Sequence, residues 1–120
     1  RMLMNYGELN HKQFLKPETV EEITSPQTQL DNDWGYNGYN LWVTSDTLRK
    51  LGYGDRELWQ GGGYEGTEFW IDNRRGFVGV KMSQLHPIPK SGHEFYNEFR
   101  GEVYRQIFAF EEKYGKAIRF

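Results

Sequence analysis

The feature that most constrains the fold of this 120-residue sequence is a long amphipathic helix near its C-terminal end. Ser91 and Glu94 stand three residues apart and fit a capping box, in which the two side chains satisfy exposed backbone donors at the start of a helix. Behind them, apolar residues recur at helical spacing: Phe95, Phe99, Val103, Ile107 and Phe110. This pattern predicts a helix from about Gly92 to Tyr114 that packs against an apolar surface.

Short strands ahead of the helix are predicted to supply that surface. Residues 41–44 alternate between Leu or Val and other residues, which is the period-two pattern of a strand, and a second strand is expected over 56–59. Two further strands, 68–72 and 77–83, form a hairpin whose loop contains Gly76, where a positive φ is convenient. The sequence therefore predicts an α+β fold: an antiparallel sheet of three or four strands with the long helix on one face.

Smaller features complete the predicted organisation. Pro17 suits a first helical position, so a short helix of about two turns is expected there. The polar residues of 25–37 indicate a loop. Alternation within the last strand is expected to place three residues on one of its faces: Val78, Val80 and Met82.

Composition excludes several kinds of protein. The formal charge of -2 and the pI near 5.9 give no basic footprint for nucleic acid. No apolar run reaches the roughly 18 to 20 residues of a membrane span. The three histidines are dispersed without metal-ligand spacing, so no metal or other cofactor is expected. The absence of cysteine is compatible with either the cytoplasm or the periplasm, so the compartment stays open.

A glycine-dense stretch between two predicted strands carries the local chemical signal. Gly61, Gly62, Gly63 and Gly66 lie close together. Because glycine has no Cβ, its backbone N–H groups can point at a ligand and its φ can be positive without a clash. The stretch is therefore a candidate ligand-binding turn, and the competing interpretation is a tight connection between strands.

Five blocks of the chain occur in a recognisable order, and they are Arg1–Asn10, Phe14–Thr24, Gly38–Val43, Phe69–Gln84 and Phe99–Phe108. Together they resemble the late region of the serine β-lactamase-related family, which includes penicillin-binding-protein-like hydrolases and esterases. The resemblance implies a partial fold of that family over residues 1–120, as a single domain or a fragment. The family's Ser-x-x-Lys and Tyr-x-Asn motifs do not occur in this sequence and would be expected upstream.

The resemblance also implies roles for the glycine stretch. The family's third motif, Lys or His, then Thr, Ser or Gly, then Gly, is matched best by Gln60, Gly61 and Gly62. These residues and Tyr64 would contact the substrate, and Gly63 would be a backbone oxyanion donor, acting only with an upstream Ser. Gln60 can hydrogen-bond a carboxylate but cannot neutralise it, which disfavours recognition of a β-lactam carboxylate and favours esterase-like or weakened activity of the parent protein.

These observations lead to two candidate functions. The first is the C-terminal segment of a serine β-lactamase-like hydrolase, which supplies the glycine-rich wall of an acyl-transfer cleft for a small acyl substrate and is inactive alone. The second is a non-enzymatic binding or interaction module from a diverged family member. Self-association, or packing with a missing N-terminal part, is also expected, through a sheet face carrying some of Trp42, Trp59, Phe69, Trp70 and Ile71.

Overall fold

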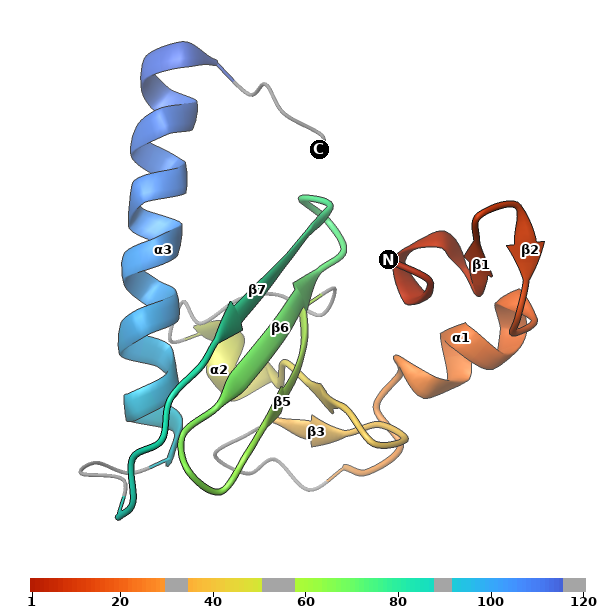
Figure 1. Cartoon of the computed structure of the whole chain (residues 1–120), viewed down its shortest axis with the longest axis horizontal. Coiled ribbons are helices and arrows are strands. Elements are labelled where there is room, and N and C mark those ends of the chain that lie inside the picture. Colours follow the sequence, from red (N-terminus) through yellow and green to blue (C-terminus); the bar gives the residue numbers. More distant parts are fainter. Residues whose placement is uncertain (30–34, 51–57, 88–91, 116–120) are drawn as a thin grey trace.

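The protein is an α+β structure in which one five-stranded antiparallel sheet carries a long C-terminal helix (Figure 1). The computed structural model describes residues 1–29, 35–50, 58–87 and 92–115. In chain order the elements are η1 (Leu3–Asn5), β1 (Glu8–Leu9), β2 (Lys12–Gln13), α1 (Pro17–Ile23), β3 (Tyr36–Asn37), β4 (Trp42–Val43), α2 (Asp46–Lys50), β5 (Leu58–Gly62), β6 (Glu68–Asp72), β7 (Phe77–Lys81) and α3 (Gly92–Tyr114).

The sheet has the strand order β3-β4-β5-β6-β7, and each strand is antiparallel to its neighbours. Its five strands are one more than the upper limit of the three or four predicted. The additional strand is β3, which lies in the stretch predicted to be loop, and its two residues are too few to show an alternating pattern. β1 and β2 form a separate two-stranded sheet.

Several local predictions are confirmed. α1 begins at Pro17 and buries Val20. The β6–β7 hairpin closes with a hydrogen bond from Gly76 N–H to the Asp72 carbonyl at 2.8 Å, and Gly76 has a φ of 76°. That positive φ is accessible to glycine at little steric cost, which explains why this residue follows Asn73, Arg74 and Arg75 in the loop.

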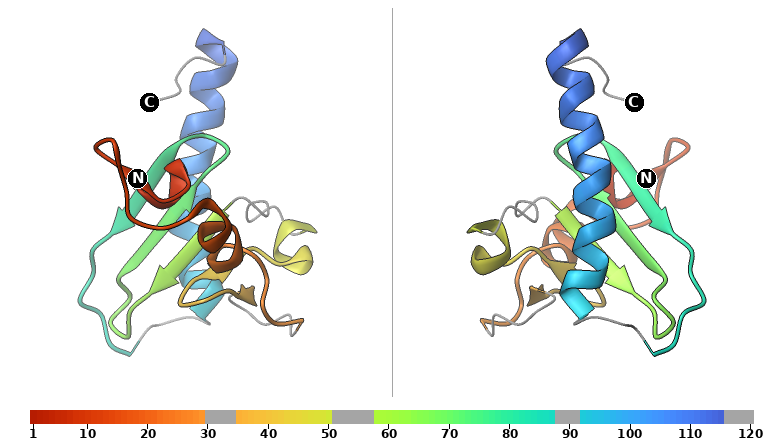
Figure 2. Two further views of the ribbon diagram at one scale, coloured as in Figure 1. Left: turned by 90° about the vertical axis from the view of Figure 1, so that its right-hand side faces the viewer. Right: turned by 90° about the vertical axis from the view of Figure 1, so that its left-hand side faces the viewer.

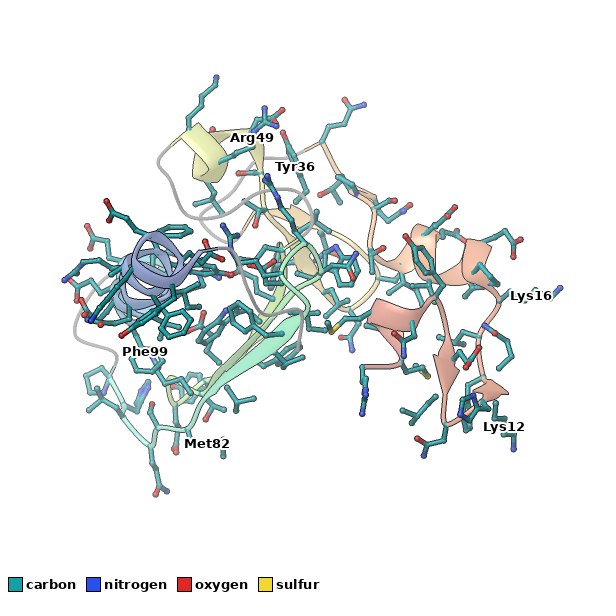
Figure 3. All side chains as sticks on the ribbon, turned by 90° about the horizontal axis from the view of Figure 1, so that it is seen from above. Lys12, Lys16, Tyr36, Arg49, Met82 and Phe99 are labelled. Atoms are coloured by element: carbon teal, nitrogen blue, oxygen red, sulfur yellow. The ribbon has the colours of Figure 1, made fainter. Side chains whose placement is uncertain are left out.

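Two layers cover opposite faces of the sheet, α3 on one face and the N-terminal segment on the other (Figure 2). Seen along the helix, α3 lies at one side of the sheet with Phe99, while Lys12 and Lys16 mark the N-terminal segment at the other side (Figure 3). The layer of the N-terminal segment encloses the main apolar core. Its buried members are Leu41, Val43, Trp59 and Ile71, and Leu3, Met4, Ile23 and Tyr36 pack against them.

β5 lies where the two layers overlap. Leu58, Trp59 and Gln60 are consecutive residues whose side chains alternate between the two faces, and yet all three are buried. Trp59 faces the N-terminal layer, and Gln60 faces α3. The strand is thus enclosed from both sides.

Burial on the sheet face opposite α3 differs from the prediction. Trp59 and Ile71 were expected among the uncovered side chains, but the N-terminal segment buries both of them. Trp70 is 1% exposed and contacts Phe99 of α3, so it belongs to the helix-covered face. The uncovered part of the face opposite α3 is smaller than predicted and lies towards β7, where Val78 and Val80 are 46% and 59% exposed. Those two residues share a face, as the alternation predicts.

The limits of α3 agree with the prediction, but the side of the helix buried most deeply against the sheet differs from the predicted apolar stripe, of which Phe99 contacts Trp70. Asn97 and Arg100 are buried, and Tyr104 contacts Asp72 and Phe77 of the hairpin. The predicted apolar stripe is less buried, since Phe99 is 43% and Phe110 is 45% exposed. The stripe lies about a quarter to a third of a turn around the helix from the side held by the sheet. Its first member, Phe95, lies outside the described side chains.

Candidate functional site

The glycine stretch borders a cleft on the face of the sheet that α3 leaves open. The cleft has a volume of about 610 Å³ and lies between the N-terminal segment and β4 to β6. Gly61 and Gly62 of β5 form part of its wall beside Phe69 of β6. The remaining lining residues are Leu3, Ile23, Asn37, Tyr39, Asn40, Leu41 and Trp42. Of the described residues that line the cleft, none carries a formal charge.

Gly61 allows a close approach between two strands. A Cβ on Gly61 would lie 2.5 Å from Cε1 of Phe69, its partner across β5 and β6. The Phe69 ring therefore lies against bare backbone, which no larger residue at position 61 would permit without a shift. Gly61 is a predicted site residue because it has no side chain. In the structure this allows the Phe69 ring to pack against the Gly61 backbone in the cleft wall.

Gly63 lies at the end of β5, in the turn to β6. Its N–H donates to the Thr67 carbonyl at 2.7 Å, and its own carbonyl accepts a hydrogen bond from Gly66 N–H at 3.0 Å. Gly66 has a φ of 82°, so it also provides the positive φ that the turn requires. The N–H predicted to be an oxyanion donor thus closes the β5–β6 turn.

Tyr64 lies at the tip of that turn and is 77% exposed. Its ring stacks on His86 with centroids 4.3 Å apart, and its hydroxyl lies 3.0 Å from His86 Nε2. The described lining of the cleft does not include Tyr64. The structure therefore brings together two of the five predicted site residues, Gly61 and Gly62, in the cleft.

Gln60 faces the opposite side of the sheet and belongs to a polar network beneath α3. Its Oε1 accepts a hydrogen bond from Arg100 Nη1, and Arg100 Nη2 donates to Asn97 Oδ1. Arg100 Nη1 also lies 3.6 Å from Glu68 Oε1. Gln60, Glu68, Asn97 and Arg100 are each 5% exposed or less. Gln60 therefore positions α3 on β5, and its side chain is directed away from the cleft.

Glu68 is the electrostatically strained member of this network. Both carboxylate oxygens are buried, and neither has a hydrogen-bond partner among the described residues. Burial raises the pKa of the Glu68 carboxyl above its ordinary value, against the opposing effects of Arg100 and of Lys81, the residue across from it on β7. Burial also lowers the pKa of the Arg100 guanidinium. The mutual attraction of the two charges therefore offsets only part of the cost of burying them.

A second polar group extends the contact between α3 and the β6–β7 hairpin. Tyr104 donates a hydrogen bond to Asp72 Oδ2 at 2.5 Å, and Arg75 N–H donates to Asp72 Oδ1 at 2.8 Å. Burial and the bond to Asp72 raise the pKa of the Tyr104 hydroxyl. Arg75 Nε lies 3.8 Å from Glu111 Oε1 on the next part of the helix. These groups fix the helix to the sheet.

Sequence reasoning missed this network. Glu68 and Asp72 flank Trp70 on one face of β6, and Asn97, Arg100 and Tyr104 recur on one side of α3. Charged residues at such positions usually face water, so their spacing alone gave no reason to pair them. An acidic residue on each side of a buried Trp in a strand is the one local signal that could have pointed to it.

Comparison with known proteins assigns no family: no family model matches the chain, and no curated protein matches it. None of the helices in the described ranges is long and apolar enough to cross a membrane. Within the same ranges, no group of three or more His, Asp or Glu residues could hold a metal ion.

Proposed function

We propose that this chain is the C-terminal segment of a serine β-lactamase-like hydrolase and supplies one wall of its acyl-transfer cleft. The proposal depends on the sequence resemblance, and one structural observation supports it. Gly61 and Gly62 line a cleft on the sheet face opposite α3, where Gly61 seats the Phe69 ring and Gly62 is exposed. Backbone exposed in this way can bind an acyl group without a competing side chain.

The cleft favours a neutral acyl substrate. The polar side chains along it are amides and a phenol, from Asn37, Asn40 and Tyr39, and the other described lining side chains are apolar or aromatic. Gln60, which replaces the motif's Lys or His, is held by Arg100 on the far side of the sheet. No described lining residue could neutralise a substrate carboxylate, so a short neutral ester is a better substrate than a β-lactam acid.

An oxyanion role for Gly63 would require a change at the β5–β6 turn. Its N–H would have to exchange the bond to the Thr67 carbonyl for a bond to the substrate. In the intact hydrolase, Gly63→Val should then lower acyl transfer by about 100-fold or more, the scale of a lost oxyanion donor. Unchanged kinetics in a folded Gly63→Val variant would reject this role.

Binding to the cleft can be tested on the chain itself by titrating a short-chain neutral ester and following amide resonances by NMR. We expect shifts at Gly61, Gly62 and Phe69, and weaker shifts with an ester that carries a carboxylate. Tyr39→Ala should weaken binding, because Tyr39 lines the cleft and is 53% exposed. Tyr64→Ala is the matched control at the turn tip and should leave binding unchanged. Equal effects of the two variants would reject the cleft as the site.

Turnover separates the hydrolase from the second candidate, a non-enzymatic binding module. Two hydrogen bonds favour the module. The Gln60 side chain accepts from Arg100 and the Gly63 N–H donates to the Thr67 carbonyl, so both groups expected to contact a substrate have partners within the protein. The chain alone should hydrolyse neither chromogenic β-lactams nor short-chain esters, since it has no Ser-x-x-Lys motif. Labelling of the full-length protein by a serine-directed fluorophosphonate supports the hydrolase, and ester binding without labelling supports the module.

A further inference from the structure

An apolar groove of about 580 Å³ lies between the outer edge of β7 and the flank of α3. β7 ends the five-stranded sheet, and in the described part of the chain it pairs with β6 alone. Phe77 and Gly79, on the side of β7 that faces α3, line the groove with Val103 and Ile107 of the helix, while the Val78 and Val80 side chains alternate to the other face of the sheet. The outer edge of a sheet presents backbone donors and acceptors that can pair with another strand.

The flank of α3 that lines this groove carries four apolar residues beside Gln106 and Glu111. Arg100 and Tyr104 hold one side of the helix against the sheet, which turns the neighbouring side towards β7. That neighbouring side carries the stripe Phe99, Val103, Ile107 and Phe110. Two of these rings are nearly half exposed, and an apolar patch of this kind marks a contact surface.

We propose that the β7 edge and this α3 flank together bind a second copy of the chain, through antiparallel pairing of the two β7 strands about Gly79. Pairing centred there places Val78 opposite Val80 of the second copy, and β-branched cross-strand pairs stabilise a sheet. Gly79 meets Gly79 of the second copy without side chains that could clash. The result is one continuous ten-stranded sheet, twice the five strands of each copy.

The groove favours a second copy over a single extended peptide. A two-fold interface requires a surface that is complementary to itself. The uncharged segment Val78–Val80 matches itself when reversed, and the two α3 flanks lie on the same side of the joined sheet and face each other across the axis. A single peptide strand would satisfy the backbone edge and leave the exposed rings of the flank uncovered. The ester cleft is lined by other residues and stays accessible in such a dimer.

Sedimentation of the 120-residue chain tests this interface. We expect a dimer of twice the 14.3 kDa chain mass at micromolar concentration. Val80→Lys should raise the dissociation constant on the order of tenfold or more, because it places a charge on the paired edge. Val80→Thr keeps the β-branched shape and should have a smaller effect. Tyr64→Lys adds the same charge at the distant turn and should have none.

The register can be tested by cross-linking, since the chain contains no cysteine. In Val78→Cys/Val80→Cys, the thiol at position 78 lies directly opposite the thiol at position 80 of the second copy, so mild oxidation should yield covalent dimers. Val78→Cys alone faces a valine and should remain uncross-linked. A monomer at all concentrations, a dimer insensitive to Val80→Lys, or equal cross-linking of the single and double variants would overturn the proposal. None of these readouts depends on hydrolase activity.

Discussion

Replacing the buried Arg100 should destabilise the protein more than replacing any other cation of α3. Arg100→Met keeps much of the side-chain volume but leaves the Glu68 carboxylate, 2% exposed, without the guanidinium that lies 3.6 Å from it. It also removes the donors to Gln60 and Asn97. Removing one partner of a buried ion pair costs about 3 to 5 kcal/mol, so the free energy of unfolding should fall by about that amount.

Urea unfolding followed by far-UV circular dichroism measures this loss. Arg105→Met is the matched control on the same helix, since Arg105 is 73% exposed and pairs with Glu102 at 2.5 Å. An exposed pair contributes about 0.2 to 1 kcal/mol. The double variant Arg100→Met/Glu68→Gln should recover at least about 1.5 kcal/mol, because it removes the unpaired buried charge. A loss for Arg100→Met no larger than for the control, or a double variant no more stable than Arg100→Met, would refute this reasoning.

Two further predictions concern pH and glycine packing. Because burial raises the pKa of Glu68 above its ordinary 4.5, the folded chain binds this proton more tightly than the unfolded chain. Its contribution to stability is complete below pH 4.5 and is lost as the pH rises through the folded pKa. Glu68→Gln should therefore flatten the decline of the urea midpoint over that range, and an unchanged profile would contradict the assignment. Gly79→Ala should lower the free energy of unfolding by about 1 to 3 kcal/mol, since its Cβ would lie 2.2 Å from Cζ2 of Trp70. In Gly101→Ala the new Cβ on α3 meets open space, so the free energy of unfolding should rise by up to about 1 kcal/mol. Thermal melts in which both variants change the melting temperature in the same direction would contradict this packing.

The elements that sequence predicts well are those specified by neighbouring residues. Helical spacing placed α3 at Gly92–Tyr114, although the capping residue Ser91 lies outside the described residues, and alternation around Gly76 placed the β6–β7 hairpin. Both depend on contacts within a few residues along the chain. β4 lies within the strand predicted over 41–44, whereas β3 has only two residues and lies in a stretch predicted to be loop, so pairing across the sheet defines it.

The orientation of α3 was predicted less well, for a physical reason. Hydrophobic spacing identifies the most apolar side of a helix, and that side is normally buried. Here the bonds of Arg100 to Gln60 and of Tyr104 to Asp72 select a different side. The first of these bonds joins residues 40 positions apart, so no local pattern could reveal it.

The candidate site was predicted in part. The lack of side chains at Gly61 and Gly62 follows from residue type alone, and both glycines line the cleft. Which face Gln60 occupies depends on strand register, and a shift by one residue reverses every side chain. The engagement of the Gly63 N–H depends on the geometry of the turn closed by Thr67. These two properties need three-dimensional pairing and cannot be obtained from composition or spacing.

The double enclosure of β5 has a consequence for motion within the native state. Backbone amides in a strand covered from both sides exchange with solvent only when much of the molecule opens, whereas edge strands exchange through local fraying. Leu58, Trp59 and Gln60 should therefore report the free energy of global unfolding in native-state hydrogen exchange. Release of either the N-terminal layer or α3 alone would leave β5 covered on its other face. The protein can thus loosen one layer at a time while the centre of its sheet persists.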